Sequence, residues 1–269
     1  MEAVMMIGWP IDYEELTSRN IGVITEEEQE ILRNSTIAIA GCGCMGGLAA
    51  DLLARFGIGH IKIADPDVFD VSNINRQNMA RRSTVGHNKA EVLGQWLEDL
   101  NPDMKIEVYN TAINDKNAKE FLTGADYAID GIDFYNFQDA LFFHQEAYRN
   151  KQFVSLATAI GFGANVFTFD PDGITFEDYL GYSGEDNFSI PPEKYCPFLP
   201  SYVNSEIIDK VVNDKSTIIP SIGLAQALGN ALLVTEIVCF LINKKLPISI
   251  PNFISIDLID LKIRTNIGV

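Results

Sequence analysis

Short apolar runs alternate with amphipathic stretches through the first 160 residues of the chain. The apolar runs have the length of β-strands and lie at 35–40, 60–64, 105–109, 125–130 and 153–158. Between them, apolar residues recur three or four positions apart, as on the buried face of a helix, at 48–56, 85–100, 117–122 and 136–150. This alternation predicts an α/β fold: a Rossmann-like, mainly parallel sheet with helices on both faces.

The pattern changes in the second half of the chain. Residues 164–169 and 174–176 are expected to form antiparallel strands around a turn at 170–173, because Asp-Pro-Asp-Gly is typical turn chemistry. Further on, the apolar spacing predicts a helix at 217–244 and a late strand at 253–261. The parallel sheet is therefore expected to continue into an antiparallel portion.

The N-terminal region carries one clear helix signal. Residues 1–17 show no periodicity, and we expect them to form an arm that packs on a partner subunit. Thr25 is followed three positions later by Glu28, which is the spacing of a capping box at a helix start. That helix is expected to end near residue 34.

One polar, proline-containing segment is long for a loop within a compact domain. It covers about residues 178–216, and loops of this length often act as lids or are mobile. We divide the chain into an N-terminal arm and helix, 1–34, and a single domain, 35–269, which contains this loop.

The clearest motif is a glycine turn between the first predicted strand and its helix. Gly41, Gly43 and Gly46 follow the Gly-x-Gly-x-x-Gly pattern, and Asp65 ends the second predicted strand. Glycines let the backbone turn tightly and approach a phosphate, while the helix N-terminus offers N–H groups to an anion. This arrangement predicts a nucleotide site. Asp65 suits the ribose of NAD and of ATP equally well.

The polar residues that follow favour ATP. They are Asp67, Asn73, Arg76, Gln77 and Lys89. A hydride-transfer site has little use for cations at the phosphate end of its cofactor, whereas cleavage of a triphosphate builds charge on phosphate oxygens that must be stabilised. The pattern D-x-D…S-N-x-x-R-Q…G-x-x-K after a glycine loop resembles the ThiF/MoeB/HesA adenylyltransferases, relatives of the ubiquitin-activating enzymes. The resemblance extends over about residues 19–261.

The resemblance implies a role for each of these positions. Asp65 would bind the ribose, and Arg76 and Lys89 would hold phosphate oxygens with support from Asn73. The remaining positions that the motif assigns to ATP are Gly41, Gly43, Gly46, Asp67 and Gln77. The implied reaction is the attack of a substrate carboxylate on the α-phosphate, with pyrophosphate as the leaving group.

The resemblance also implies a metal and a second subunit. Asp133, which follows the fourth predicted strand, would hold Mg²⁺ beside the phosphates. Arg19, ahead of the first predicted helix, would cross the interface of a homodimer and reach the ATP of the neighbouring subunit.

Each candidate also has a structural interpretation. Asp65 and Asp67 could be acids in a turn at the end of a strand, and Asp70 is expected to be one. Arg76 and Lys89 could be solvated surface charges, the usual fate of such residues. Asp133 could cap the helix predicted at 136–150. The ordered set favours a functional interpretation over coincidence.

The cysteines depart from the family pattern. Cys44 stands where the loop commonly has glycine, which places the nucleotide contact there in doubt, and no Cys-x-x-Cys pairs exist, so no structural zinc is expected. Cys196 lies where several relatives carry a cysteine that accepts the activated acyl group. The alternative is an ordinary loop thiol, because a reactive thiol needs exposure and nearby positive charge. Cys239 is expected to be packed in a helix.

The composition limits the partners. The net charge is −17, which opposes nucleic acid or an anionic membrane as the main partner, since both require a basic surface. No apolar run is expected to span a membrane, and the start of the chain lacks the basic residues of a secretion signal. We expect a cytoplasmic protein.

Four functions are consistent with the sequence. The favoured one is an ATP- and Mg²⁺-dependent adenylyltransferase that activates a carboxylate, such as the C-terminus of a small ubiquitin-like or sulfur-carrier protein or of a peptide. The alternatives are an ATP-dependent dehydratase of a modified tRNA nucleoside, an NAD-dependent oxidoreductase and a catalytically idle dimeric scaffold.

Overall fold

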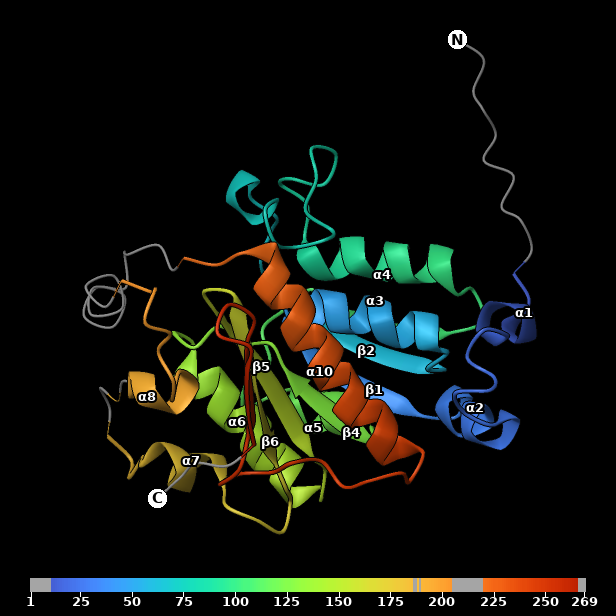
Figure 1. Cartoon of the computed structure of the whole chain (residues 1–269). Helices are drawn as coiled ribbons and strands as arrows, with labels where there is room; N and C mark the ends of the chain where they lie inside the picture. Colours follow the sequence, from blue (N-terminus) through green and yellow to red (C-terminus); the bar gives the residue numbers. More distant parts are fainter. Residues whose placement is uncertain (1–10, 186–187, 189, 205–219, 266–269) are drawn as a thin grey trace.

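The fold is built on one eight-stranded sheet. The structure is a computed structural model, and it describes residues 11–185, 188, 190–204 and 220–265. The strands lie in the order β3-β2-β1-β4-β5-β6-β7-β8 (Figure 1). Their bounds are β1 Thr36–Ala40, β2 His60–Ala64, β3 Lys105–Tyr109, β4 Tyr127–Asp130, β5 Val154–Ile160, β6 Gly163–Phe169, β7 Ile254–Asp257 and β8 Lys262–Arg264.

The first five strands are parallel and the last three are antiparallel. β3, β2, β1, β4 and β5 pair in parallel, and the strand order reverses between β1 and β4. At such a reversal the carboxyl ends of two neighbouring strands open onto a crevice that binds ligands in this class of sheet. β6, β7 and β8 then pair antiparallel. The predicted Rossmann-like sheet with an antiparallel continuation is confirmed.

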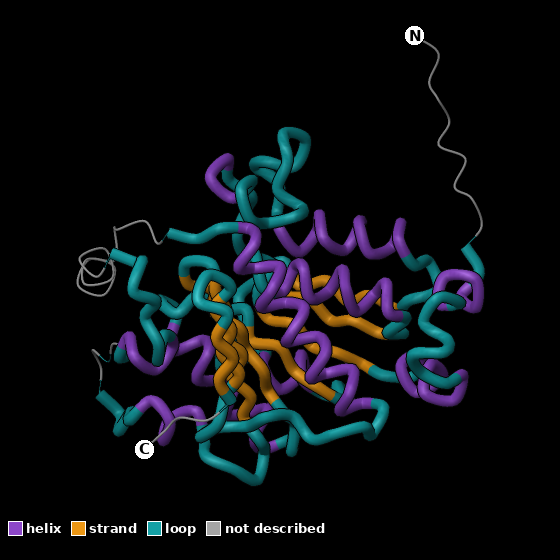
Figure 2. Tube along the Cα trace, in the orientation of Figure 1, coloured by secondary structure: helices purple, strands orange, loops and turns teal. Residues whose placement is uncertain are grey.

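Helices cover both faces of the sheet (Figure 2). The strand β1 shows how the sequence separates the layers: Ile37 and Ile39 join the core beneath α3, α4 and α10, whereas Ala38 and Ala40 join the core beneath α5, α6 and α7. The helices are α1 Tyr13–Thr17, α2 Glu26–Arg33, α3 Gly46–Phe56, α4 Lys89–Leu100, α5 Ala118–Leu122, α6 Phe137–Arg149, α7 Phe176–Leu180, α8 Pro192–Tyr195 and α10 Gly223–Leu241, with a 3₁₀ turn at Val71–Asn73.

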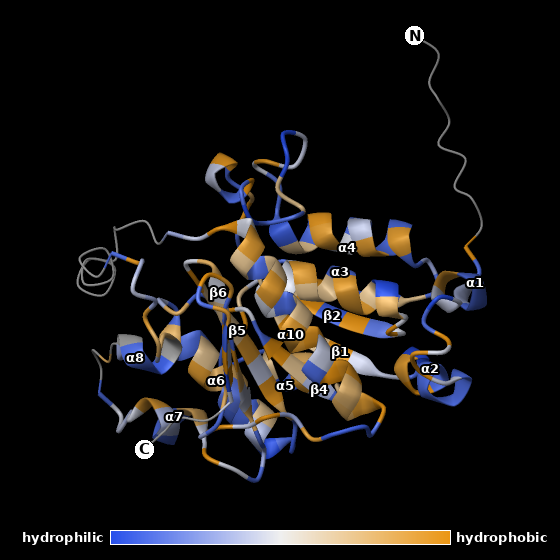
Figure 3. Ribbon diagram, in the orientation of Figure 1, coloured by the Kyte–Doolittle hydropathy of each residue, from blue (hydrophilic) through white to orange (hydrophobic). Residues whose placement is uncertain are grey.

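The long helix α10 is apolar on nearly all sides (Figure 3). By length and composition it resembles a membrane-crossing helix, but 56% of its most apolar window is buried inside the molecule. The helix α10 packs against β5, β6 and α3. Because most of its surface is buried in these contacts, its apolar composition is that of a core helix. Two of its buried polar residues make side-chain contacts: Asn230 donates to the carbonyl of Cys44 over 3.1 Å, and Glu236 pairs with Lys245. The amide oxygens of Gln226 and Asn230 have no hydrogen-bond partner among the described residues.

Several local predictions were right, and the capping box is one of them. The Thr25 hydroxyl accepts the N–H of Glu28, and the Glu28 carboxylate accepts the N–H of Thr25. Others need correction. The predicted strand at 174–176 is wrong, because Thr175 caps α7 by accepting the N–H of Asp178 over 3.2 Å. The helix predicted from residue 85 begins only at Lys89.

The ends of the chain also differ from the prediction. The helix α1 was not predicted, and the late strand at 253–261 ends at Asp257, where a turn leads into β8. The long polar loop begins within α7 and contains α8, and its residues 186, 187, 189 and 205–216 lie outside the described part of the chain, as do residues 217–219 of the predicted helix and residues 1–10 of the predicted arm. The helix predicted at 217–244 is shorter in its described part, where it forms α10 from Gly223 to Leu241.

Candidate nucleotide site

The glycine loop lies between the ends of β1 and β4. Gly41 has a φ of +92°, and a Cβ atom added to it would lie 2.2 Å from the carbonyl oxygen of Gly131. A Cβ on Gly46 would lie 1.9 Å from the carbonyl oxygen of Gly41. These two glycines are therefore required by backbone packing. Gly43 has more room, because a Cβ there would only approach the Gln77 amide nitrogen at 3.7 Å.

The first turn of α3 follows this loop and is suited to an anion. Met45 occupies the cap position and makes no side-chain capping bond to the described residues, and the first turn contains no acidic residue. The N–H groups and the positive end of the helix dipole therefore face the loop without a carboxylate of that turn to neutralise them. A phosphate group is the natural ligand of such a helix start.

Asp65 holds the glycine loop in place. One carboxylate oxygen accepts the N–H of Cys42 over 2.6 Å, and the other accepts the N–H of Asp67 over 2.8 Å. Burial raises the pKa of this carboxyl, and the charge of Lys89 opposes the increase. Each oxygen can still accept a second hydrogen bond. Asp65 therefore lies at the end of β2, where the sequence motif predicts a ribose ligand. Its hydrogen bonds also hold the glycine loop in position.

Lys89 is brought to the loop by the start of α4. Asn88 caps this helix by accepting the N–H of Glu91, and its amide donates to the carbonyl oxygens of Asp65 and Asp67 over 3.0 and 3.1 Å. The Lys89 ammonium lies 2.9 Å from the Asp67 carboxylate, and the lysine side chain is 11% exposed. The two residues Asn88 and Lys89 therefore tie α4 to the end of β2.

Arg76 approaches the loop from the segment after the 3₁₀ turn. Its guanidinium donates to the carbonyl oxygen of Ser72 and to the side chain of Asn75, each over 2.9 Å. Burial raises the pKa of the Cys44 thiol, whereas the charges of Arg76 and Lys89 lower it. Both cations therefore act electrostatically on the glycine loop.

Asn73 and Gln77 have structural contacts in this segment. The Asn73 side chain accepts the N–H of Asp70, and its carbonyl accepts the N–H groups of Arg76 and Gln77 over 3.0 and 2.9 Å. Asp70 is a turn acid, as expected, because it accepts the N–H of Ser72. Gln77 is buried beside Gly43, and its amide oxygen has no hydrogen-bond partner in the described part of the chain.

Asp133 lies on the loop that follows β4. The loop touches the glycine turn, since Gly131 donates its N–H to Ala40 over 2.7 Å. Asp133 is exposed, and one of its carboxylate oxygens accepts the N–H of Tyr135 over 3.1 Å. It does not cap α6, whose cap position is Asn136.

An exposed carboxylate beside phosphates fits Mg²⁺, which is commonly bound by one or two carboxylates together with substrate phosphates and water. Within the described residues, no group of three or more His, Cys, Asp or Glu side chains could hold a metal by itself. Asp133 therefore fits a metal that a nucleotide brings with it.

Comparison with known proteins agrees with this geometry. The ThiF family profile matches residues 17–267. The chain belongs to the ThiF family. The resemblance indicated by the sequence motif is thereby confirmed.

The relatives that match this ThiF-family chain have different names. A tRNA threonylcarbamoyladenosine dehydratase of Bacillus subtilis is 38% identical over 117 residues, which are 43% of this chain and 46% of that protein. A probable molybdopterin-synthase adenylyltransferase of Porphyra purpurea is 36% identical over 107 residues, 40% of this chain and 28% of that protein. The match thus spans less than half the length of either relative.

A solved structure shows the same fold. Escherichia coli MccB, crystallised with ATP, superimposes with a TM-score of 0.68 over 90% of this chain and 66% of MccB, at 22% identity. MccB has also been solved with MccA. At this identity the likeness establishes the ThiF-type fold of the chain.

Arg19, the residue that the ThiF resemblance assigns to a neighbouring subunit, lies away from the glycine loop of its own chain. It is exposed in the turn between α1 and α2. The adjacent Asn20 donates to the carbonyl oxygen of Phe56, at the C-terminal end of α3. The glycine loop is at the opposite end of that helix, so Arg19 lies away from the site of its own subunit. Its contact with a neighbouring subunit stays a prediction.

Cys196 also lies outside the cluster around the glycine loop. It follows α8, and its thiol donates to the carbonyl oxygen of Phe198 over 3.6 Å. Burial raises the pKa of this thiol to about 11. A raised pKa does not favour the role of acyl acceptor, because the thiolate is the nucleophile.

The pH dependence of alkylation should reveal this environment. Because the thiol has an ordinary pKa of 9.0 when unperturbed and about 11 in the fold, the Cys196 thiolate should be about 100-fold scarcer at pH 8 than in the unfolded chain. We expect its iodoacetamide labelling, followed by peptide mass spectrometry, to keep rising up to at least about pH 11. The urea-unfolded protein should level off near the ordinary pKa. A plateau near neutral pH in the folded protein would instead indicate an activated thiol.

A hollow of about 330 Å³ lies between the antiparallel strands and residues 197–201. Tyr202 fastens this segment to the sheet, since its hydroxyl donates to Asp257 over 2.6 Å and accepts the N–H of Phe162. On the wall, the Arg264 guanidinium lies 4.2 Å from the centre of the Phe198 ring. The hollow has the size of a ligand pocket.

Two contacts at the site were not predicted. Asn88 was recognised only as part of a motif, although Asn before an amphipathic helix is a capping signal that the sequence contains. Asn230 stabilises the glycine loop from α10 by donating to the carbonyl oxygen of Cys44. Cys44 itself packs against the core, so the loop accommodates this departure from glycine.

Proposed function

We propose that this chain is an adenylyltransferase that binds ATP with Mg²⁺ at the glycine loop and transfers AMP to a substrate carboxylate. A carboxylate oxygen attacks the α-phosphorus, a new P–O bond forms, and the bond to the bridging oxygen breaks. Pyrophosphate leaves with the electron pair, and the product is an acyl-adenylate. Both reactants are anions, so the site must hold them together and stabilise the leaving charge.

The observation that carries the proposal is the pair of cations at the loop. Lys89 contacts Asp67, whose N–H is bound by the loop anchor Asp65. Arg76 directly precedes Gln77, whose amide lies beside Gly43. Both cations belong to a protein whose net charge is −17. Local positive charge at a glycine turn and an uncapped helix start is what a triphosphate requires. Asp133 would hold Mg²⁺, which would neutralise phosphate charge when it is bound.

The proposed substrate is the C-terminal carboxylate of a small carrier protein or peptide. The crystallised pairing of MccB with MccA and the naming of a relative as a molybdopterin-synthase adenylyltransferase support this class. We further propose that the protein acts as a homodimer in which Arg19 reaches the neighbouring site.

A second candidate is supported by the names of two relatives. Dehydratases of threonylcarbamoyladenosine in tRNA are 38% and 33% identical to parts of this chain, in Bacillus subtilis and Escherichia coli. Removal of water at the expense of ATP can use the same first step, in which the departing oxygen attacks the α-phosphorus, AMP becomes attached to that oxygen, and pyrophosphate leaves. The net charge of −17 opposes tRNA binding, which makes this the weaker candidate.

The two candidates separate in one experiment. We expect ATP–pyrophosphate exchange when the purified chain is given a carrier protein or peptide with a free C-terminus, and none with threonylcarbamoyladenosine-containing tRNA. Arg76→Ala should reduce the exchange about 100-fold, and Arg82→Ala, at an exposed position nearby, should leave it unchanged. Exchange with the tRNA alone would establish the second candidate. ATP binding without exchange on any acceptor would indicate an idle scaffold.

A further inference from the structure

His144 and Asp130 form an ion pair or hydrogen-bonded pair in the interior. The His144 Nε2 atom lies 2.9 Å from one oxygen of Asp130, and the two side chains are only 2% and 3% exposed. Neither residue belongs to the glycine loop or to the motif that identifies the family. A buried polar pair of this kind costs desolvation and has to be explained by what it holds in place.

The second oxygen of Asp130 holds the loop that carries Asp133. It accepts the N–H of Ile132 over 2.9 Å, directly before the proposed metal ligand. Asp130 is the last residue of β4, and the neighbouring Gly131 is bonded to Ala40 beside the glycine turn. One carboxylate therefore binds the loop backbone with one oxygen and a helix side chain with the other.

The helix in question is α6, which begins on the far side of the same loop. His144 lies about two turns into α6, whose first residue is Phe137. The contact between His144 and Asp130 thus joins the two elements that flank the loop, the end of β4 and the start of α6. Residues 131–136, which include Asp133, lie between these two anchors.

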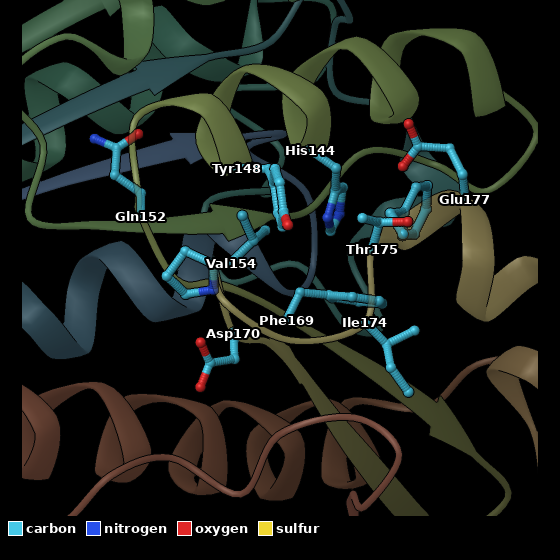
Figure 4. A pocket seen from close by; sticks show the side chains of 11 residues that line it. His144, Tyr148, Gln152, Val154, Phe169, Asp170, Ile174, Thr175 and Glu177 are labelled. Carbon is cyan, nitrogen blue, oxygen red and sulfur yellow. The ribbon is translucent and has the colours of Figure 1, made fainter.

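The imidazole is itself held rigidly. It stacks on the ring of Phe176 with a centroid distance of 3.9 Å and an angle of 8°, and it meets Phe169 edge-on at 4.9 Å. Figure 4 shows the His144 side chain beside Tyr148 and Thr175, on the wall of a hollow of about 20 Å³. That volume has room for about one water molecule, so the hollow is not a substrate site.

We propose that the Asp130–His144 pair is a positioning device that sets the place of Asp133, and hence the affinity of the enzyme for Mg²⁺ together with ATP. The inference rests on the proposed function, because Asp133 matters as a metal ligand only if ATP binds at the glycine loop. Partners behind a metal ligand commonly change metal affinity about 10- to 100-fold when they are removed. Without His144, the buried Asp130 carboxylate keeps only the N–H of Ile132 among its partners in the described residues, and its hold on the loop is weakened.

The test uses His144→Phe, which keeps an aromatic ring against Phe176 but cannot bond to Asp130. ATP binding is measured by titration calorimetry over a range of Mg²⁺ concentrations. We expect that the Mg²⁺ concentration needed for half of the full Mg²⁺ effect on ATP affinity rises by about 10-fold or more. The ATP affinity measured without Mg²⁺ should remain unchanged. His60→Phe is the matched control, because this half-buried histidine lies at the start of β2 and pairs with Glu107. His60→Phe should not change the Mg²⁺ dependence of ATP binding.

A double-variant comparison shows whether the effect passes through Asp133. In an Asp133→Asn background, His144→Phe should cause no further change in the Mg²⁺ dependence, since the two residues act as one unit. If His144→Phe does not fold, as judged by circular dichroism, Asp130→Asn is tested by the same criteria. A wild-type Mg²⁺ dependence in the folded variant, or an undiminished effect in the Asp133→Asn background, overturns the inference. Absence of ATP binding by the wild-type protein overturns the proposed function instead.

Discussion

Replacing Lys89 with methionine should lower the rate of ATP–pyrophosphate exchange about 10²- to 10³-fold. The ammonium lies at the start of α4, within electrostatic reach of the glycine loop, and its side chain is mostly buried. Charge that is fixed in a partly desolvated site stabilises a transition state far better than charge in water. Methionine keeps most of the length of the side chain and removes the charge.

The loss should be catalytic and not a consequence of unfolding. The partner of Lys89, Asp67, has a side chain that is 66% exposed, and the buried Asp65 keeps the N–H groups of Cys42 and Asp67 as partners when the lysine is removed. Thermal unfolding should therefore shift little. Lys119→Met, on the exposed side of α5, is the matched control and should retain full exchange. Exchange at the wild-type rate in the Lys89 variant would remove the lysine from the reaction.

Gly41→Ala should destabilise the protein by about 3 kcal/mol or more. The substitution combines two penalties, a left-handed backbone with φ of +92° and a Cβ atom that would lie 2.2 Å from the carbonyl oxygen of Gly131. The atom that the new Cβ would meet belongs to the backbone, so the clash cannot be relieved by moving a side chain. The clash can be relieved only if β1 and β4 move apart at the nucleotide site. Denaturant unfolding gives the free energy directly.

Gly124→Ala separates the two penalties. Gly124 has a φ of +77°, but no atom of the described residues lies within 4 Å of an added Cβ, so only backbone strain is expected, about 1 kcal/mol. The difference between the two variants measures the clash at the junction of β1 and β4. Equal destabilisation would show that the glycine loop does not contact the loop after β4 as closely as described.

The sequence predicted most of the sheet because its strands are buried apolar runs with glycine or polar ends. It failed in two places, for different reasons. Residues 174–176 have the apolar character of a strand, but the hydroxyl of Thr175 starts a helix there. β8 has only three residues, and Ile263 on it is 71% exposed, so no buried pattern marks it. Pairing with β7 creates this strand.

The site was predictable to the extent that it is local. The glycines, Asp65 and Lys89 follow one another at fixed spacing, and the fold brings them together. The contact of His144 with Asp130 spans 14 residues and joins a strand to a helix, so only the fold reveals it. Arg19 shows the opposite case, because its predicted partner is in another subunit and one chain cannot display the contact.

The central claim is that the glycine loop binds ATP. Calorimetric titration of the whole chain with ATP and Mg²⁺, and in parallel with NAD⁺, tests it most directly. We expect one ATP to bind per chain and no heat to be released or absorbed on titration with NAD⁺. ATP binding should be lost or strongly weakened in Lys89→Met and unchanged in Lys119→Met. Saturable NAD⁺ binding without an ATP response would contradict it.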